Sequence, residues 1–209
     1  MRGLILVAIN SLCGMAQAAD LVIKIEDPKK RPVVDAVVSL HQPNLPARVS
    51  KPTVAVIDQR QREFVPYVTV VQQGTQIRFP NSDHIRHHVY SFSPIKRFDL
   101  QLYKGTTAAP ITFDQAGVAV LGCNIHDWML AYVKVVDTPY FGQSTAKGVV
   151  HLSNIPAGRY ELHIWHPRRQ KPIEVPISVG ETPQQWVQTL SYDSPDPRQS
   201  APIEKSMYD

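Results

Sequence analysis

The sequence has few cysteines, no strong excess of charge and no long apolar run. Only two of its 209 residues are cysteines, Cys13 and Cys123, too few for the disulfide framework of a small secreted domain. Its 22 basic and 18 acidic residues form no basic stripe with interleaved aromatic residues, which argues against nucleic acid as a partner. Neither a glycine-rich phosphate loop nor a G-x-S-x-G elbow is present.

Residues 1–18 have the order of a secretory signal peptide. Arg2 precedes an apolar run at residues 4–9, and small residues follow up to the A-x-A pattern at residues 16–18. We expect cleavage after Ala18 or one residue later. An uncleaved anchor is the alternative, although the run is far shorter than the ~20 residues of a membrane span. The mature chain is predicted to be periplasmic and to contain no membrane span.

Short segments rich in Val, Ile, Thr, Tyr and Phe, separated by many of the 18 prolines and 10 glycines, make up the rest of the chain. This spacing predicts an all-β protein built from sandwiches. A middle block, residues 51–137, holds Cys123 and four of the eight histidines. The flanks, residues 20–48 and 148–191, are predicted to form together a six-stranded sandwich with the middle block inserted. The polar residues 192–209 are expected to be disordered.

Export leaves Cys123 without a partner in the mature chain, because Cys13 would leave with the signal peptide. Such a thiol is a buried inert residue, an intermolecular bridge or a metal ligand. The segment GCNIHDWM at residues 122–129 places Cys123, His126 and Met129 at steps of three along one loop. Upstream, the segment NSDHIRHHV at residues 81–89 supplies a second imidazole, His87. Two imidazoles, a thiolate and a weak thioether form a ligand set that suits a copper ion cycling between two oxidation states.

Each of these residues also has a structural explanation when taken alone. Cys123 could be a small buried hydrophobe, Met129 core filler and His126 a surface residue. Their joint occurrence at ligand spacing favours the metal site. His87 and His88 would point to opposite faces of a strand, so only one can face Cys123, and the register favours His87. His84 and Asp127 also lie near the site in sequence and could contribute to it.

On these residues the chain resembles the cupredoxins, in particular plastocyanin and amicyanin. Asn81 lies six residues before His87, Val89 lies two residues after it, and the segment FDQAG at residues 113–117 lies five residues before Cys123. The resemblance covers roughly residues 64–136 and extends to bacterial plastocyanin-like proteins labelled methylamine utilisation proteins. It implies a Greek-key β-sandwich that binds one type 1 copper ion through His87, Cys123, His126 and Met129.

Two further features bear on the site and its surroundings. His88 stands where plastocyanins have an asparagine that braces the cysteine loop, so the redox potential is not predicted. Residues 31–40 and 152–160 resemble carboxypeptidase-regulatory-type sandwich modules, which serve as scaffolds or binding platforms. His151, His163 and His166 lie in these flanks. They are either a second metal site or, more commonly, exposed strand histidines.

The resemblance implies an electron carrier that meets a redox partner such as a c-type cytochrome or a periplasmic dehydrogenase. The partner would dock where His126 reaches the surface, with Trp128, Ile125 and Phe92 as candidate contact residues. Periplasmic copper sequestration or delivery is the alternative. An enzyme is not expected, because the multicopper enzymes need histidines flanking the cysteine, where Gly122 and Asn124 stand here. A structural module with an inert cysteine is a further alternative.

Overall fold

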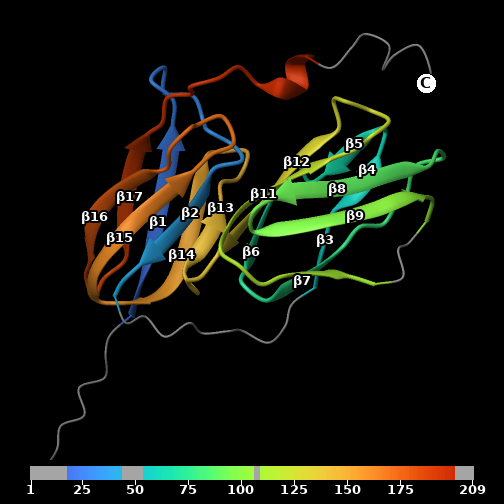
Figure 1. Cartoon of the computed structure of the whole chain (residues 1–209). Coiled ribbons are helices and arrows are strands. Elements are labelled where there is room, and N and C mark those ends of the chain that lie inside the picture. Colours follow the sequence, from blue (N-terminus) through green and yellow to red (C-terminus); the bar gives the residue numbers. More distant parts are fainter. Residues whose placement is uncertain (1–17, 44–53, 106–108, 201–209) are drawn as a thin grey trace, which may run out of the picture.

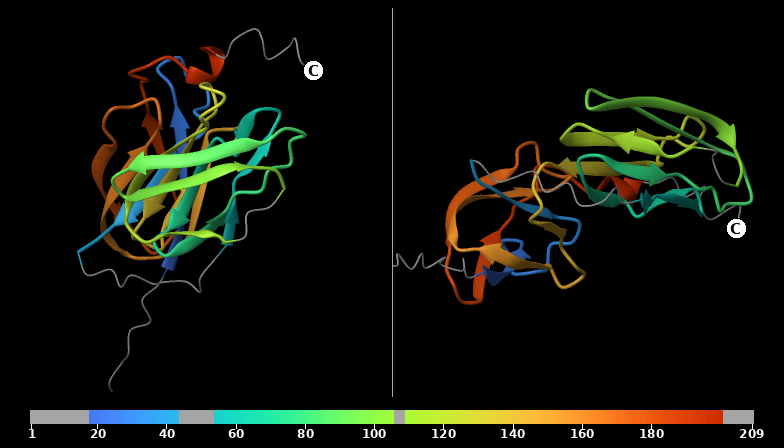
Figure 2. Two further views of the ribbon diagram at one scale, coloured as in Figure 1. Left: turned by 45° about the vertical axis from the view of Figure 1, so that its right-hand side comes forward. Right: turned by 90° about the horizontal axis from the view of Figure 1, so that it is seen from below.

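A computed structural model describes residues 18–43, 54–105 and 109–200 of the chain. These residues form strands and one short 3-10 helix, η1 (Pro197–Ser200). The predicted all-β class is confirmed, and the strands assemble into two lobes that lie side by side (Figure 1). Figure 2 shows the same two lobes from two further directions. The described residues contain no helix with the length and apolar character that a membrane crossing requires.

The flanking segments build the first lobe from two sheets. One sheet has the order β14 (Val149–Pro156), β1 (Ala18–Glu26), β17 (Gln184–Thr189); the other has the order β13 (Phe141–Gln143), β2 (Val37–His41), β15 (Gly158–Trp165), β16 (Ile173–Val179). Strand β1 pairs antiparallel with β14 and parallel with β17. The predicted second sandwich formed by the flanks is therefore present, and β13 is a strand beyond the six that the sequence predicts.

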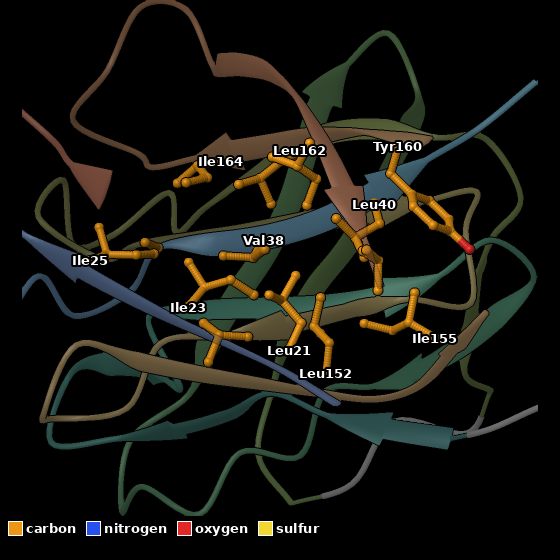
Figure 3. Close-up of a cluster of buried hydrophobic side chains, with 14 of the residues drawn as sticks. Leu21, Ile23, Ile25, Val38, Leu40, Leu152, Ile155, Tyr160, Leu162 and Ile164 are labelled. Carbon is orange, nitrogen blue, oxygen red and sulfur yellow. The ribbon is translucent and has the colours of Figure 1, made fainter. Parts of the chain in front are cut away.

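The core of this first sandwich follows from the alternation of apolar residues. In β1, Leu21, Ile23 and Ile25 are buried whereas Lys24 is exposed, the two-residue period of a strand with one face on the core. Figure 3 shows these side chains packed against residues of β2, β14 and β15 between the sheets. The lobe therefore has a hydrophobic core of its own.

The middle of the chain forms the second lobe. Its larger sheet has the order β6 (Val68–Gln72), β12 (Leu130–Val136), β11 (Gly117–Gly122), β8 (His87–Ser93), β9 (Lys96–Tyr103). A second sheet has the order β10 (Ile111–Phe113), β7 (Thr75–Arg78), β3 (Val54–Val56), and β4 (Asp58–Arg60) pairs with β5 (Glu63–Val65). Phe79, Phe113 and Leu121 are fully buried members of the core of this lobe, which also includes Cys123 and Met129.

Residues 192–200 differ from the disordered tail that their composition predicts. The Arg168 guanidinium lies 3.7 Å from the centroid of the Tyr192 ring. Arg198, in η1, pairs with Asp35 of the first lobe at 3.0 Å and lies over Tyr67 of the second lobe at 4.1 Å. Ionic and cation–π contacts, together with the packing of Tyr192 against the core of the first lobe, hold this segment, so its low apolar content was a poor guide. Residues 1–17 of the predicted signal peptide and residues 201–209 lie outside the described residues.

Candidate metal centre

The three strands β8, β11 and β12 meet at one end of the larger sheet. His87 is the first residue of β8, Cys123 directly follows β11, and Met129 directly precedes β12. Since β11 pairs with β12 and with β8, Gly122 lies opposite both Leu130 and Tyr90. The loop of residues 123–129 is therefore held at both ends, next to the start of β8.

The structure brings together three of the four sequence-predicted ligands around the sulfur of Cys123. Its Sγ atom lies 3.9 Å from Nδ1 of His87 and 3.9 Å from Nδ1 of His126. The ring centroids of the two histidines are 5.0 Å apart. One potential ligand atom from each of these residues lies within 4.8 Å of the others. Both imidazoles thus present the same type of nitrogen to one thiol.

Three members of this group are buried and the fourth is partly exposed. His87 is 0% exposed, Cys123 3% and Met129 2%, whereas His126 is partly exposed. Met129, the fourth predicted residue, belongs to the same hydrophobic core cluster as Cys123, and both residues line a groove beside the loop of residues 123–129. His126 is therefore the member of the group through which the site reaches the surface.

Asp83 fixes the orientation of His87. Its Oδ2 atom lies 2.7 Å from Nε2 of His87, and an ionised carboxylate only accepts, so Nε2 carries a proton and Nδ1 is the nitrogen left to face Cys123. The same carboxylate accepts hydrogen bonds from the backbone amides of Arg62 at 2.8 Å and Gln61 at 3.2 Å. Asp83 was not predicted from the sequence as a site residue, although it lies four residues before His87.

Asn81 holds the loop that leads into β8. Its side-chain amide donates to the carbonyl groups of Ile85 at 3.0 Å and Tyr103 at 2.8 Å. Its side-chain oxygen accepts from the amide of Asp83 at 3.0 Å. The buried asparagine six residues before His87 therefore positions the carboxylate that in turn orients the imidazole.

The protonation equilibria of the metal-free group reflect this network. Burial alone would raise the pKa of Cys123, but the hydrogen bond with His87 and those from the backbone amides of His88 and Ile125 outweigh it and lower that pKa. Burial would lower the pKa of His87, but Cys123 and Asp83 raise it above its usual value. Burial, and then repulsion by His87, lowers the pKa of His126. Cys123 therefore loses its proton more readily than an ordinary cysteine, and the thiolate that results is the metal-binding form.

The other residues considered near the site take different positions. His88 bonds to Asp99 through Nε2 and lies beside Tyr90, with ring centroids 5.5 Å apart. His84 is exposed, with Nδ1 3.8 Å from Oδ1 of Asp83. Within the part of the chain that the structure describes, the group of potential ligands around Cys123 includes neither of these histidines nor Asp127.

A groove runs along the sheet beside the loop. It is lined by Tyr90, Phe92, Val120, Gly122 and Cys123, together with Ser93, Leu121, Asp127, Met129 and Leu130. A Cβ atom at Gly122 would lie 2.7 Å from Cζ and the hydroxyl oxygen of Tyr90. Only glycine therefore allows the Tyr90 ring to pack against the strand immediately before Cys123.

The histidines of the first lobe do not form one cluster. His166 is buried, with Nε2 3.1 Å from the carbonyl oxygen of Val34, and His151 is exposed on β14. His163 instead lies with Glu161 and Glu174. The combination of His151, His163 and His166 considered from the sequence is therefore not found among the described residues.

The lobe that carries this group is a β-sandwich, with the candidate ligands at the start of β8 and in the β11–β12 loop. Neither a family model nor a curated protein matches the chain. Among solved structures, the reduced Cu(I) form of a P52G mutant of amicyanin is 18% identical, with a TM-score of 0.37 over 47% of this chain and 98% of that one.

Two other similar structures are a purple cupredoxin from Nitrosopumilus maritimus and a Cu-containing nitrite reductase from Thermus scotoductus. The first is 19% identical, with a TM-score of 0.35 over 40% of this chain and 99% of that one. The second is 22% identical, with a TM-score of 0.38 over 56% of this chain and 28% of that one. Each similarity covers only part of the present chain.

Proposed function

We propose that this chain is an exported type 1 copper protein that carries single electrons between redox partners. The observation that carries the proposal is the convergence of two imidazole Nδ1 atoms, each 3.9 Å away, on the buried sulfur of Cys123. His87 and His126 would supply two nitrogen ligands, Cys123 the thiolate and Met129 a weak axial thioether. When bound, the copper ion would supply the one-electron chemistry.

The separations between donor atoms fit a shared ion. Metal–sulfur and metal–nitrogen bonds of about 2.3 and 2.0 Å that meet at about 120° place sulfur and nitrogen about 3.7 Å apart. The distances from Cys123 to the two imidazoles agree with this value without rearrangement of the loop. The lowered pKa of Cys123 supports the deprotonated form that a ligand needs.

The surroundings of the group suit a carrier more than a delivery protein. His87, Cys123 and Met129 are buried, so a bound ion would have few routes for exchange. Partly exposed His126 offers the electron a short path to the surface, beside Ile125, which is 49% exposed. Phe92, 70% exposed at the groove along Cys123, offers apolar contact area. A small, weak interface of this kind suits a transient partner such as a c-type cytochrome or a periplasmic dehydrogenase.

The proposal is of a carrier rather than an enzyme, because Gly122 and Asn124, not histidines, flank Cys123. Copper sequestration or delivery is distinguished from electron transfer by the rate at which the bound copper is lost. A carrier should keep its copper against a chelator such as EDTA for hours, whereas a delivery protein should lose it within minutes. The proposed export is tested by fractionation, in which a mature chain that begins at residue 19 or 20 should be recovered from the periplasm.

The proposal is tested by loading the mature protein with Cu(II) and recording its visible absorption and electron spin resonance. We expect an intense thiolate-to-copper absorption band, which Cys123→Ala and His87→Gln should abolish. His88→Gln is the matched control, because His88 is adjacent in sequence but points away from Cys123. Circular dichroism of each metal-free variant verifies the fold. An unchanged spectrum in folded Cys123→Ala would show that the sulfur is not a ligand.

A further inference from the structure

A second group of potential ligands lies on the first lobe, on the face of the β13-β2-β15-β16 sheet that points away from the core. His163 of β15 lies opposite Glu174 of β16. Glu161 lies two residues before His163, on the same face of β15. One potential ligand atom from each of these three residues lies within 4.8 Å of the others. Strand register therefore gathers an imidazole and two carboxylates on one patch.

Among the described residues, a carboxylate of this patch pairs with its own histidine rather than with a lysine or arginine. Nε2 of His163 lies 2.9 Å from Oε2 of Glu161. Within residues 18–43, 54–105 and 109–200, neither Glu161 nor Glu174 has an ion pair with a lysine or arginine. Two carboxylates held this close repel each other, and a cation between them would remove that repulsion.

His41 holds the imidazole of His163 in place without competing for a ligand position. The two rings stack with centroids 4.1 Å apart and an interplanar angle of 31°. Nδ1 of His41 lies 3.3 Å from Oδ1 of Asp137, and Nε2 lies 2.9 Å from Oγ of Ser39. Because both nitrogens are engaged, His41 forms a wall of the patch.

We propose that His163, Glu161 and Glu174 bind a divalent transition-metal ion, with Zn²⁺ as the probe, at a site separate from the sulfur group. One nitrogen and two carboxylate oxygens are ligands that suit Zn²⁺ and similar borderline ions, whereas the first group, which contains a thiolate, is suited to copper. The site lies on an open face, since Glu161 and Glu174 are exposed. Water or an external ligand would complete the coordination.

The proposal is tested on the full chain carrying Cys123→Ala, which removes the thiolate that would otherwise bind zinc. Equilibrium dialysis against Zn²⁺, followed by elemental analysis, should find one zinc per chain. In this background His163→Gln and Glu174→Gln should each weaken binding by at least about 100-fold, because each removes a direct ligand. His151→Gln, on exposed β14 of the same lobe, is the matched control and should bind zinc unchanged.

Circular dichroism of each metal-free variant shows whether it folds. If one of the two ligand variants does not fold, the other still tests the site. X-ray absorption at the zinc edge should report nitrogen and oxygen neighbours without sulfur. Absence of stoichiometric zinc, or binding that survives in folded His163→Gln and Glu174→Gln, would overturn the site. Neither result bears on copper binding, because the tested background lacks Cys123 and the two groups share no residue.

Discussion

Asp83 is the residue whose removal should change the proposed copper site most without removing a ligand. Its carboxylate accepts the Nε2–H bond of His87 at 2.7 Å, and its side chain is only 7% exposed. Asp83→Asn keeps the size of the side chain but removes its charge. The asparagine amide can also donate to Nε2, so the variant no longer selects the Nε2–H tautomer of His87, the neutral form that can bind a metal through Nδ1.

Two effects of Asp83→Asn can be worked out from this geometry. Mutation of the carboxylate that holds a histidine ligand costs about 10- to 100-fold in metal affinity. A negative charge about 7 Å from an ion at Nδ1, at an effective dielectric constant of about 20, interacts with each unit of its charge by about 2 kcal/mol. Since Cu(II) carries one more positive charge than Cu(I), the potential should rise by roughly 100 mV, because about 59 mV corresponds to a tenfold change for one electron.

The assay is competitive Cu(I) and Cu(II) titration together with voltammetry of the loaded protein. Asp99→Asn is the matched control, because Asp99 pairs with His88 rather than with a proposed ligand. We expect the control to leave both quantities near the wild-type values. An Asp83→Asn variant with wild-type affinity and a potential within about 20 mV of wild type would refute the role assigned to this carboxylate.

Two further predictions concern the axial residue and the first lobe. Met129→Leu, at a buried position, should retain copper with a loss of unfolding free energy below about 1.5 kcal/mol, and voltammetry should show a raised potential because the weak thioether donor is gone. Burial lowers the pKa of His166 to about 4 from 6.5, so the unfolded chain binds the additional proton. The stability that neutral His166 contributes should be fully present above pH 6.5 and fall by up to about 3 kcal/mol between pH 6.5 and 4. Urea unfolding of metal-free His166→Gln should lack this component, and an identical pH dependence in the variant and wild type would contradict the prediction.

How much of the site can be predicted depends on how far apart its residues are in sequence. Cys123, His126 and Met129 share one loop, so their spacing alone suggests a ligand set. His87 joins them only through the pairing of β8 with β11, which local spacing does not predict, and the family resemblance supported its place in the ligand set. The role of Asp83 was missed because four residues within an irregular loop do not define a contact as they do on a helix.

The first lobe shows the same limit for contacts that depend on strand register. The opposition of His163 and Glu174 follows from the pairing of β15 with β16, and a shift by one residue would place them on opposite faces. Strand β13 covers only residues 141–143, too short for an alternating pattern to identify. Arg198 contacts residues more than a hundred positions away in sequence. Because the segment around it contains few apolar residues, its sequence did not indicate that it is ordered.

The contacts between the lobes suggest what the first lobe contributes to the proposed copper site. Tyr132, in the strand that directly follows Met129, packs against Trp165 of the first lobe with ring centroids 5.9 Å apart. Arg198 lies over Tyr67 and, with Trp128 and Met129, lines a small cavity behind the loop. This cavity is lined by residues of the second lobe and by Arg198 of the C-terminal segment, which in turn pairs with Asp35 of the first lobe. Because a ligand geometry is maintained only when its supporting shell is packed, we expect these contacts through Tyr132 and Arg198 to limit movement of the loop when the charge of a bound ion changes.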